Sequence, residues 1–417
     1  MEKICFLMAT PFTKGGEQRV VSVLSNLLYE KGFDVTILCT DFTPINYDLY
    51  NLNPRVNIIF LDGYQNPVLG EKRVRRDKLY KYNLETGRYK HFLSIQKYIN
   101  CDNDTRELVA NCINKEGFDY VISLSTIYNT MLAVISNRIK AKTIGWQHSC
   151  FERYFRTPGE RHYNQDKFSK YMFKQLDEYV VLTTHDQQRL KEEFNINSIV
   201  INNPKSINSN IVSTLENKKF VALGRFVEVK NYEMLIDMFY EFNKKNKEWT
   251  LDIYGEGPLK DKLIEKVKTY NLEDYITIHP YEQNVENCYL NGSVYLMSSL
   301  MEGWGMVIGE AMEFGLPVIS FNISSAPEMI TDNKNGFIVE NYNKEMYVNK
   351  MLQLAENPDL LHKMGKEARN ASLSRTNISI ANQWINLFTY MREKDKKYKL
   401  FELYDTIRVG RVRQDKL

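Results

Sequence analysis

One pattern of strand, loop, helix and strand opens the chain and returns in its second half. Ile4 to Ala9 reads as a short buried strand, a loop and a helix with regularly spaced apolar residues follow it, and "DVTILCT" gives a second strand. The same order returns with "FVALG", a loop, a helix and "LDIYG". Strands that alternate with helices predict parallel sheets with helices on their faces. The sequence therefore predicts the α/β class, with two doubly wound, Rossmann-like domains that face each other across a cleft.

The length agrees with two such domains. A chain of 417 residues is too long for one ordinary core and suits two domains of roughly 200 residues each. The stretch from Asn202 to Lys218 is rich in Asn, Ser and Pro, which favours a boundary there. We therefore expect a first domain over 1–202, a second over 203–375, and a helical tail over 376–417 that packs back on the first domain. Ligands of such sheets bind outside the carboxyl ends of the strands, so the cleft is the expected site.

Composition and charge exclude several classes of protein. The net charge of +3 is too small for a general nucleic-acid binder, which carries a concentrated basic face. The six cysteines form no Cys-x-x-Cys pair, so neither a zinc site nor a disulfide framework is expected. The start "MEKICFLMAT" lacks the features of a signal peptide, and no apolar run reaches the roughly 18 residues that span a bilayer. We therefore expect a cytoplasmic protein.

The segment "SSLMEGWGMVIGEAMEFGLPVISF" places two carboxylates, Glu302 and Glu310, around a glycine-rich turn. The turn at 302–305 follows a predicted strand and precedes a helix expected from Met306 to Phe314. Exposed backbone N–H groups in such a turn, with the helix dipole behind them, favour a diphosphate. The two carboxylates would flank this anion and stay free to accept hydrogen bonds from sugar hydroxyls. The alternative is a solvated loop acid and a carboxylate that only complements the helix dipole.

Cations and glycines lie in the loops that follow the first strand of each half. Arg225 and Lys230 come after "FVALG", where two cations can hold phosphate oxygens and neutralise the charge of a leaving group. Gly15 and Gly16 lie in the matching loop of the first half, where they let the backbone approach a ligand closely. The alternatives are solvated surface cations and an ordinary loop before a helix.

Several strings together carry a resemblance to a known family. "GRFVEVKN", "YGEGPLKDKL", the run S-x-x-E-G-W-G-x-x-x-x-E-A-M-x-x-G-x-P-V-I and "NGFIVE" follow one another between Phe220 and Glu340. They resemble the retaining GT-B glycosyltransferases with the E-x(7)-E signature, the glycosyltransferase family 4-like proteins of group 1. In the first half, "GGEQRVVSVLSNLL" resembles the family's Gly-Gly loop and first helix.

This resemblance implies a nucleotide-sugar donor, most often a uridine one, held mainly by residues 203–375, with the acceptor on residues 1–202. Arg225 and Lys230 would hold the diphosphate. Glu310 would bind the ribose hydroxyls, and Glu302 a hydroxyl of the donor sugar. The donor-binding residues implied in full are Gly15, Gly16, Arg225, Lys230, Tyr281, Gly303, Trp304, Gly305, Met306 and Glu310, and the catalytic residues are Glu302, Arg225, Lys230 and His148, which ends the predicted strand "TIGWQH".

The resemblance also implies the reaction. A hexose or N-acetylhexosamine would move, with retention of its anomeric configuration, to a glycan or lipid-linked acceptor, as in bacterial surface polysaccharide or glycolipid synthesis. Front-face attack, in which the leaving diphosphate helps to deprotonate the acceptor, needs no protein nucleophile, and no metal or cofactor is expected. Two segments depart from the family's pattern. Glu17 and Gln18 replace the more usual Ala and Glu, and Pro280 stands where Gly is usual in the segment that holds the base.

Two other functions and two other features need consideration. A nicotinamide-dependent oxidoreductase would need a G-x-G-x-x-G fingerprint, which this chain lacks. A non-catalytic interaction protein would not need Glu302, Glu310, Arg225 and Lys230 to be present together.

Asp102 and Asp104 form an Asp-x-Asp string, for which a helix cap is the expected explanation. The basic run "EKRVRRDKLYKYNLETGRYKHF" and the tail from Lys394 to Lys416 either lie in solvent or contact anionic lipid at the inner face of the cell membrane.

Overall fold

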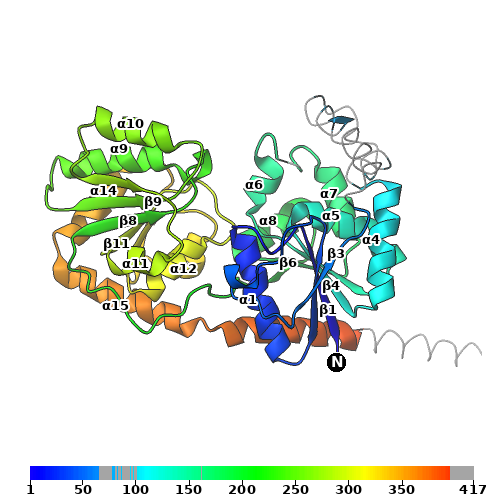
Figure 1. Ribbon diagram of the computed structural model, residues 1–417. Helices are drawn as coiled ribbons and strands as arrows, with labels where there is room; N and C mark the ends of the chain where they lie inside the picture. The colour runs from blue at the N-terminus through cyan, green and yellow to red at the C-terminus, as the bar shows by residue number, and fades with distance from the viewer. Residues whose placement is uncertain are drawn as a thin grey trace, which may run out of the picture.

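The protein folds into two lobes, each built on one sheet (Figure 1). The computed structural model describes residues 1–64, 78, 79, 82, 86, 94, 97, 101–160 and 162–394, so most of the basic run at 71–92 and the tail beyond 394 lie outside the described residues. Within the described part, all paired strands of both sheets are parallel. This arrangement confirms the predicted α/β class with two doubly wound sheets.

The first sheet has seven strands in the order β3-β2-β1-β4-β5-β6-β7. They are β1 (Lys3–Met8), β2 (Asp34–Cys39), β3 (Asn57–Phe60), β4 (Tyr120–Leu124), β5 (Lys142–Trp146), β6 (Glu178–Val181) and β7 (Ile199–Val200). The helical segments of this lobe are α1 (Gly16–Glu30), η1 (Tyr47–Leu49), α4 (Asn103–Glu116), α5 (Ser125–Ile135), η2 (Ser136–Arg138), α6 (Phe151–Arg156), α7 (Asp166–Phe173), α8 (Thr184–Arg189) and η3 (Leu190–Phe194).

The second sheet has six strands in the order β10-β9-β8-β11-β12-β13. They are β8 (Lys219–Leu223), β9 (Thr250–Tyr254), β10 (Ile276–His279), β11 (Val294–Met297), β12 (Val318–Phe321) and β13 (Gly336–Val339). The helical segments are η4 (Glu228–Lys230), α9 (Tyr232–Asn243), α10 (Lys260–Thr269), α11 (Val285–Leu290), α12 (Met306–Glu313), α13 (Ala326–Met329), α14 (Lys344–Ala355) and α15 (Pro358–Ser374). Both sheets thus contain the strand order of the Rossmann fold, and the first adds β7 at its edge.

The local sequence explains why these elements form. The strand β1 is apolar along most of its length and Ile4–Met8 are buried, because helices cover both faces of a parallel sheet. Helix α1 buries Val20, Leu24 and Leu28, which lie one turn apart on a single face. The helix ends before Gly32, whose φ of 90° is the left-handed conformation that commonly follows a helix C-terminus.

The chain crosses between the lobes twice, and the two crossings are hydrogen-bonded to each other. The first crossing is the irregular stretch 201–218 between β7 and β8, and the second lies between α15 and the helical residues 377–394. Asn377 Oδ1 accepts a hydrogen bond from Lys205 N at 2.7 Å, and Asn377 Nδ2 donates one to Lys205 O at 3.2 Å. The two crossings therefore form one joint between the lobes.

Residues 377–394 pack against the first lobe and run beneath it in Figure 1. Trp384 is fully buried, with its ring centroid 4.9 Å from that of Trp146 on β5. The ring of Phe388 lies 4.6 Å from that of Tyr120 on β4. The second crossing thus returns the chain to the lobe in which it begins.

Two sequence-based expectations can be checked on these elements. Asp102 is the N-cap of α4 and its side chain accepts a hydrogen bond from Thr105 N at 2.9 Å, which confirms the helix cap. The strand β5 ends at Trp146, so His148 lies beyond the strand and not at its end as predicted. Among the helices of the described residues, none combines the length and the apolar character needed to span a bilayer.

Candidate active site

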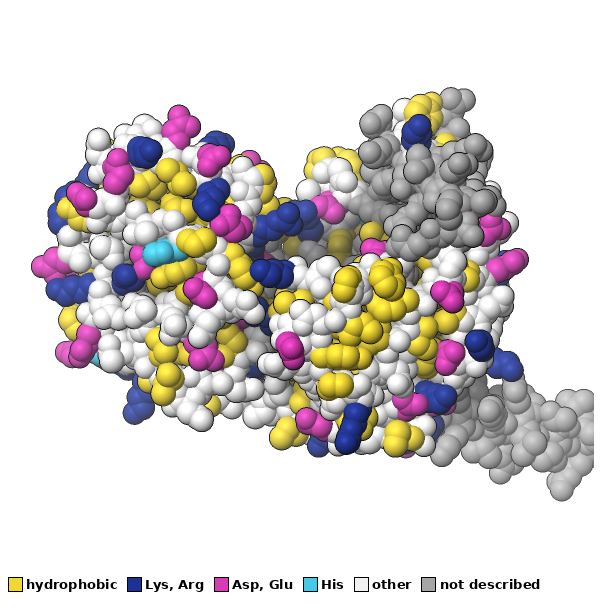
Figure 2. Space-filling model, in the orientation of Figure 1, with side chains coloured by type: hydrophobic (Ala, Val, Ile, Leu, Met, Phe, Trp, Pro, Cys, Tyr) yellow, Lys and Arg dark blue, Asp and Glu magenta, His cyan; other side chains and the backbone are white. Residues whose placement is uncertain are grey.

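The predicted site residues come from loops at the point where the strand order of each sheet reverses. These points lie between β1 and β4 in the first sheet and between β8 and β11 in the second. Gly15 and Gly16 follow β1, Arg225 and Lys230 follow β8, and the turn at 302–305 follows β11. Figure 2 shows a notch between the lobes, with Lys and Arg side chains gathered at it. Because ligands of doubly wound sheets bind at such points, this cleft is the candidate site.

The turn at 302–305 presents unpaired backbone amides at the start of α12. The helix begins at Met306, as predicted, directly after Gly305, whose φ of 64° is left-handed. Within the described part of the chain, the N–H groups of Gly303, Gly305 and Met306 find no backbone acceptor outside the helix. Because the first N–H groups of a helix also lie at the positive end of its dipole, the turn can hold an anion.

The N-terminus of a second helix, α1, lies beside this turn. Gly16 is the first residue of α1, and a Cβ atom added to it would lie 3.6 Å from Met306 Sδ. The two helices are neighbours in Figure 1. Gly15 N donates a hydrogen bond to Tyr50 Oη at 2.8 Å, which fixes the loop ahead of α1. An anion between the two helix ends would be stabilised by both dipoles.

Gly303 touches the first lobe through its backbone. A Cβ atom added to Gly303 would lie 2.1 Å from His148 O and 2.9 Å from Ser149 Cα. Both atoms belong to the backbone, so neither can move aside as a flexible side chain could. Only glycine therefore fits at this position, and the close approach brings His148 next to the turn.

The imidazole of His148 is neutral. Its ring packs on Trp146 with the centroids 4.2 Å apart, and its Nε2 is buried without a hydrogen-bond partner among the described residues. Burial lowers the pKa of His148 to about 3, because the charged form would lose its hydration. A neutral ring with an unpartnered nitrogen can form one hydrogen bond to a ligand, but it supplies no positive charge near pH 7.

Lys230 and Glu302 form an ion pair across the second-lobe loops. Lys230 Nζ lies 2.5 Å from Glu302 Oε1, and the two side chains are only 20% and 15% exposed. Ser298 Oγ donates a hydrogen bond to Lys230 O at 2.8 Å, and Ser324 Oγ donates one to Glu302 O at 3.0 Å. Lys230 and Glu302, both predicted site residues, are thus paired through their side chains, and a serine hydroxyl holds the backbone of each.

Glu310 is only 6% exposed and accepts three hydrogen bonds. Its Oε1 accepts from Arg19 Nη1 at 2.8 Å and from Ser206 Oγ at 2.6 Å, and its Oε2 accepts from Tyr289 Oη at 2.8 Å. Glu302 and Glu310 thus already have partners within the protein, which the sequence did not indicate, and their capacity to accept hydrogen bonds from sugar hydroxyls stays a prediction. A carboxylate offers about four acceptor sites, so Oε2 of Glu310 can still accept from one hydroxyl.

The glycines of "YGEG" hold the loop that carries Arg225. A Cβ atom added to Gly255 would lie 2.0 Å from Gly224 O, and one added to Gly257 would lie 2.4 Å from Phe226 O. These contacts with the backbone on either side of Arg225 leave room only for glycine. Arg225 itself is exposed at the carboxyl end of β8. Its side chain is thus presented to solvent by a firmly held loop.

Tyr281 meets a cation of the first lobe. Its side chain is 41% exposed, and Lys14 Nζ lies 4.3 Å from the centroid of its ring, within the range of a cation–π interaction. Lys14 directly precedes Gly15, so this contact ties the segment after β10 to the glycine loop.

Sequence reasoning missed Lys14 and the three partners of Glu310. Arg19 lies within the quoted string "GGEQR", but nothing in that string indicates a carboxylate in the other lobe. Ser206 on the first crossing and Tyr289 on α11 carry no motif at all. Only the fold brings these side chains together.

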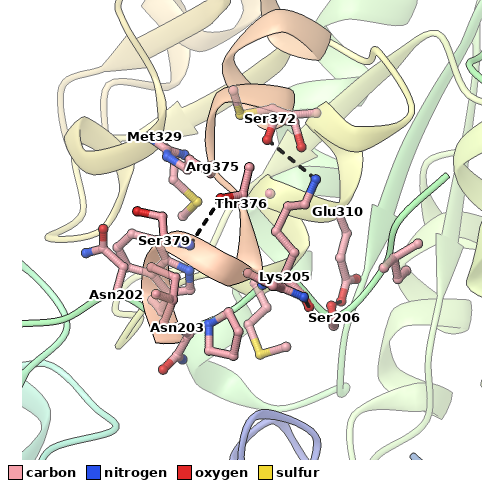
Figure 3. Close-up of a pocket in the computed structure, with 18 of the residues that line it drawn as sticks. Asn202, Asn203, Lys205, Ser206, Glu310, Met329, Ser372, Arg375, Thr376 and Ser379 are labelled. Atoms are coloured by element: carbon pink, nitrogen blue, oxygen red, sulfur yellow. Dashed lines mark hydrogen bonds between the residues drawn. The ribbon is translucent and has the colours of Figure 1, made fainter. Parts of the chain in front are cut away.

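A cavity of about 140 Å³ adjoins the joint between the lobes (Figure 3). Its walls come from the first crossing, the turn at 302–305 with α12, α13, the end of α15 and the second crossing, with Ser206, Glu310 and Arg375 among the lining residues. The cavity thus lies on the side of Glu310 that faces the joint. Across the described residues, no group of three or more His, Cys, Asp or Glu side chains could hold a metal ion.

Comparison with known proteins shows similarity to glycosyltransferases. Residues 205–371 match the family described as glycosyl transferases group 1. A glycosyltransferase of Haemophilus influenzae is 28% identical over 92% of this chain and 99% of its own. The poly(ribitol-phosphate) alpha-N-acetylglucosaminyltransferase of Staphylococcus aureus is 31% identical over 53% of this chain and 46% of its own.

A solved structure shows the same fold. The G117R mutant of S. aureus TarM, crystallised with fondaparinux, alpha-GlcNAc-glycerol and UDP, superposes with a TM-score of 0.72 over 93% of this chain and 100% of its own, at 19% identity. The chain has the GT-B fold, and its residues 205–371 match the group 1 glycosyl transferases, the family that its motifs resemble.

The close approach of Gly303 predicts a sensitive position. In Gly303→Ala, the new Cβ would overlap the backbone of His148, so the two lobes must separate locally. Overpacking of this kind costs about 1–3 kcal/mol, and we expect a fall of several degrees in the melting temperature. The matched control is Gly309→Ala on α12, where the Cβ would lie 3.7 Å from Met329 Sδ, an ordinary contact. Equal melting of both variants would contradict the close approach.

The environment of His148 predicts an unusual titration. Its pKa of about 3 means that the ring stays neutral from pH 8 down to pH 5, where an ordinary histidine becomes charged. His185 is the internal control, because its hydrogen bond to Glu152 raises its pKa. NMR titration of the ring protons, assigned with His148→Gln, would show His185 titrating and His148 unchanged. A shift of the His148 signals near pH 6.5 would contradict its burial.

Proposed function

We propose that this protein is a retaining glycosyltransferase that moves a hexose or N-acetylhexosamine from a UDP-linked sugar to a glycan or lipid-linked acceptor in bacterial surface polysaccharide or glycolipid synthesis. The observation that carries the proposal is the convergence at one cleft of two helix N-termini, the loops of Arg225 and Lys230, and the carboxylates Glu302 and Glu310. Amides and cations suit the phosphates of a nucleotide sugar, and carboxylates suit its hydroxyls.

The names of similar proteins support the finer parts of this proposal. The relative from S. aureus is named for transfer of N-acetylglucosamine to poly(ribitol-phosphate) in alpha linkage. Nucleotide sugars such as UDP-N-acetylglucosamine carry the sugar in the α configuration, so an α product corresponds to retention. TarM, similar in fold, was crystallised with UDP. We therefore take a UDP-sugar as donor and a bacterial polymer or glycolipid as acceptor.

Transfer with retention can proceed on one face of the sugar. The bond between the anomeric carbon and the diphosphate oxygen breaks, and its electron pair leaves with the diphosphate. The acceptor oxygen bonds to the same face, and its proton passes to the departing phosphate oxygen. Negative charge therefore grows on the phosphate, where Arg225, Lys230 and the helix N-termini would stabilise it.

The pair of Lys230 and Glu302 suits this sequence of events. Lys230 already lies against Glu302, so its charge is positioned before any ligand arrives. A diphosphate would share Lys230, and Glu302 could then accept a hydrogen bond from a sugar hydroxyl beside the positive anomeric carbon. His148 would contribute a hydrogen bond from its neutral ring, through the buried Nε2.

Two further expectations belong to this proposal. Charge stabilisation by side chains and amides requires no metal ion or cofactor, so we propose that EDTA leaves the rate unchanged. Contact of the basic run at 71–92 with anionic lipid at the inner face of the membrane stays a prediction, because most of that run lies outside the described residues.

A panel of ligands tests the donor. We expect UDP and UDP-sugars to raise the melting temperature, since a ligand that binds the folded state stabilises it, and NAD to leave it unchanged. Sugar transfer or slow donor hydrolysis by the same preparation should follow, and NMR of the product should show the anomeric configuration of the donor. Stabilisation by NAD alone would favour an oxidoreductase, and an inverted product would refute retention.

Lys230 allows a direct test of the catalytic role. In Lys230→Ala the cation beside the departing phosphate is lost, so kcat should fall by roughly 10²–10³-fold, as for other charge-stabilising groups. Circular dichroism should show the fold unchanged. The matched control is Lys244→Ala at the C-cap of α9, which removes an exposed lysine paired with Glu241. Sugar transfer by Lys230→Ala at the rate of the control would refute the assignment.

A further inference from the structure

The contacts of Glu310 link donor binding to the first lobe. Glu310 belongs to α12 in the second lobe, whereas its charged partner Arg19 belongs to α1 in the first. The side chain of Glu310 is only 7% exposed and that of Arg19 is 24% exposed, so the pair is largely withdrawn from water. A buried carboxylate without its cation is strongly disfavoured. The position of Glu310 therefore depends on a residue outside its own lobe.

Arg19 is itself held in place by the glycine loop. The guanidinium lies 5.4 Å from the ring centroid of Tyr50, and the hydroxyl of Tyr50 accepts the hydrogen bond from Gly15 N. One side chain thus fixes both the loop ahead of α1 and the guanidinium that reaches Glu310. Arg19 is presented to Glu310 by a preformed arrangement.

The two carboxylate oxygens of Glu310 have different hydrogen-bond partners and therefore different roles. Arg19 and Ser206 both donate to Oε1, which leaves Oε2 with Tyr289 as its partner among the described residues. A carboxylate whose Oε1 is held in this way presents Oε2 in one direction only. The guanidinium charge also offsets the repulsion between Glu310 and a diphosphate bound close by.

We infer that Arg19 is a positioning residue, which acts through Glu310 on the ribose hydroxyls of the donor and makes nucleotide recognition by the second lobe depend on contact with the first. This inference rests on the proposed function, because it assigns the ribose to Glu310. It adds that the selectivity for the hydroxyls is set across the cleft, by α1, and not by the second lobe alone.

The role of Arg19 can be tested by comparing the affinities of the protein for two nucleotides. UDP and 2′,3′-dideoxy-UDP share base and diphosphate and differ only in the ribose hydroxyls. We expect the full-length wild-type protein to bind UDP at least tenfold more tightly in calorimetry. In Arg19→Gln this ratio should fall to near one, because UDP loses affinity while the dideoxy nucleotide binds as before. Arg19→Lys, which keeps the charge, should restore part of the ratio.

Controls separate this inference from folding and from the proposed function. Arg55→Gln removes an exposed arginine of the same lobe and should keep the wild-type ratio. Should Arg19→Gln fail to fold, Ser206→Ala removes a neutral donor to the same oxygen and should lower the ratio several-fold. A wild-type ratio in a folded Arg19→Gln, or equal weakening of both nucleotides, would overturn the inference. Failure of the wild-type protein to bind UDP would instead refute the proposed donor, and the inference with it.

Discussion

The backbone contact between Gly303 and His148 sets how closely the two lobes approach, and the other contacts across the cleft depend on it. A side chain at 303 would hold the lobes apart at this point. With none there, Met306 reaches Gly16, Arg19 reaches Glu310, and Lys14 lies over Tyr281. Each of these pairs joins a loop or helix start of one sheet to one of the other. The site is therefore a product of the interface, although each lobe supplies its part from an ordinary doubly wound sheet.

The charges of the site are arranged before a ligand binds. Lys230 is paired with Glu302, Arg19 is paired with Glu310, and His148 stays uncharged because it is buried. Groups that are already fixed and desolvated need little rearrangement when charge develops on a phosphate, which is the main electrostatic advantage of an enzyme over water. The two carboxylates of the E-x(7)-E signature have different surroundings. One lies against a cation of its own lobe, and the other lies against a cation of the opposite lobe.

The sequence predicted those parts of the fold that depend on neighbours in the chain. The apolar runs of β1 and β8 and the spacing of Val20, Leu24 and Leu28 carried enough local signal, and so did the cap at Asp102. The two-residue strand β7 is too short to leave a pattern. The partners of Glu310 could not be predicted, because Arg19, Ser206 and Tyr289 meet only after both sheets have formed. For the same reason the sequence did not indicate that Lys230 donates to Glu302, or that Glu310 accepts from three side chains.

The hydrogen bonds between Asn377 and Lys205 have a consequence for motion. The two crossings pass between the lobes at one place and act as a hinge there. The lobes can rotate about an axis through this hinge, whereas sliding or twisting of one lobe against the other is opposed. Displacement in such a rotation grows with distance from the axis. Glu310 is bonded to Ser206, the residue next to Lys205, so it lies close to the axis. If the cleft opens, the ion pair of Arg19 and Glu310 would therefore be the last to separate. The cleft could then widen far from the hinge to admit an acceptor, while the nucleotide beside Glu310 stays bound.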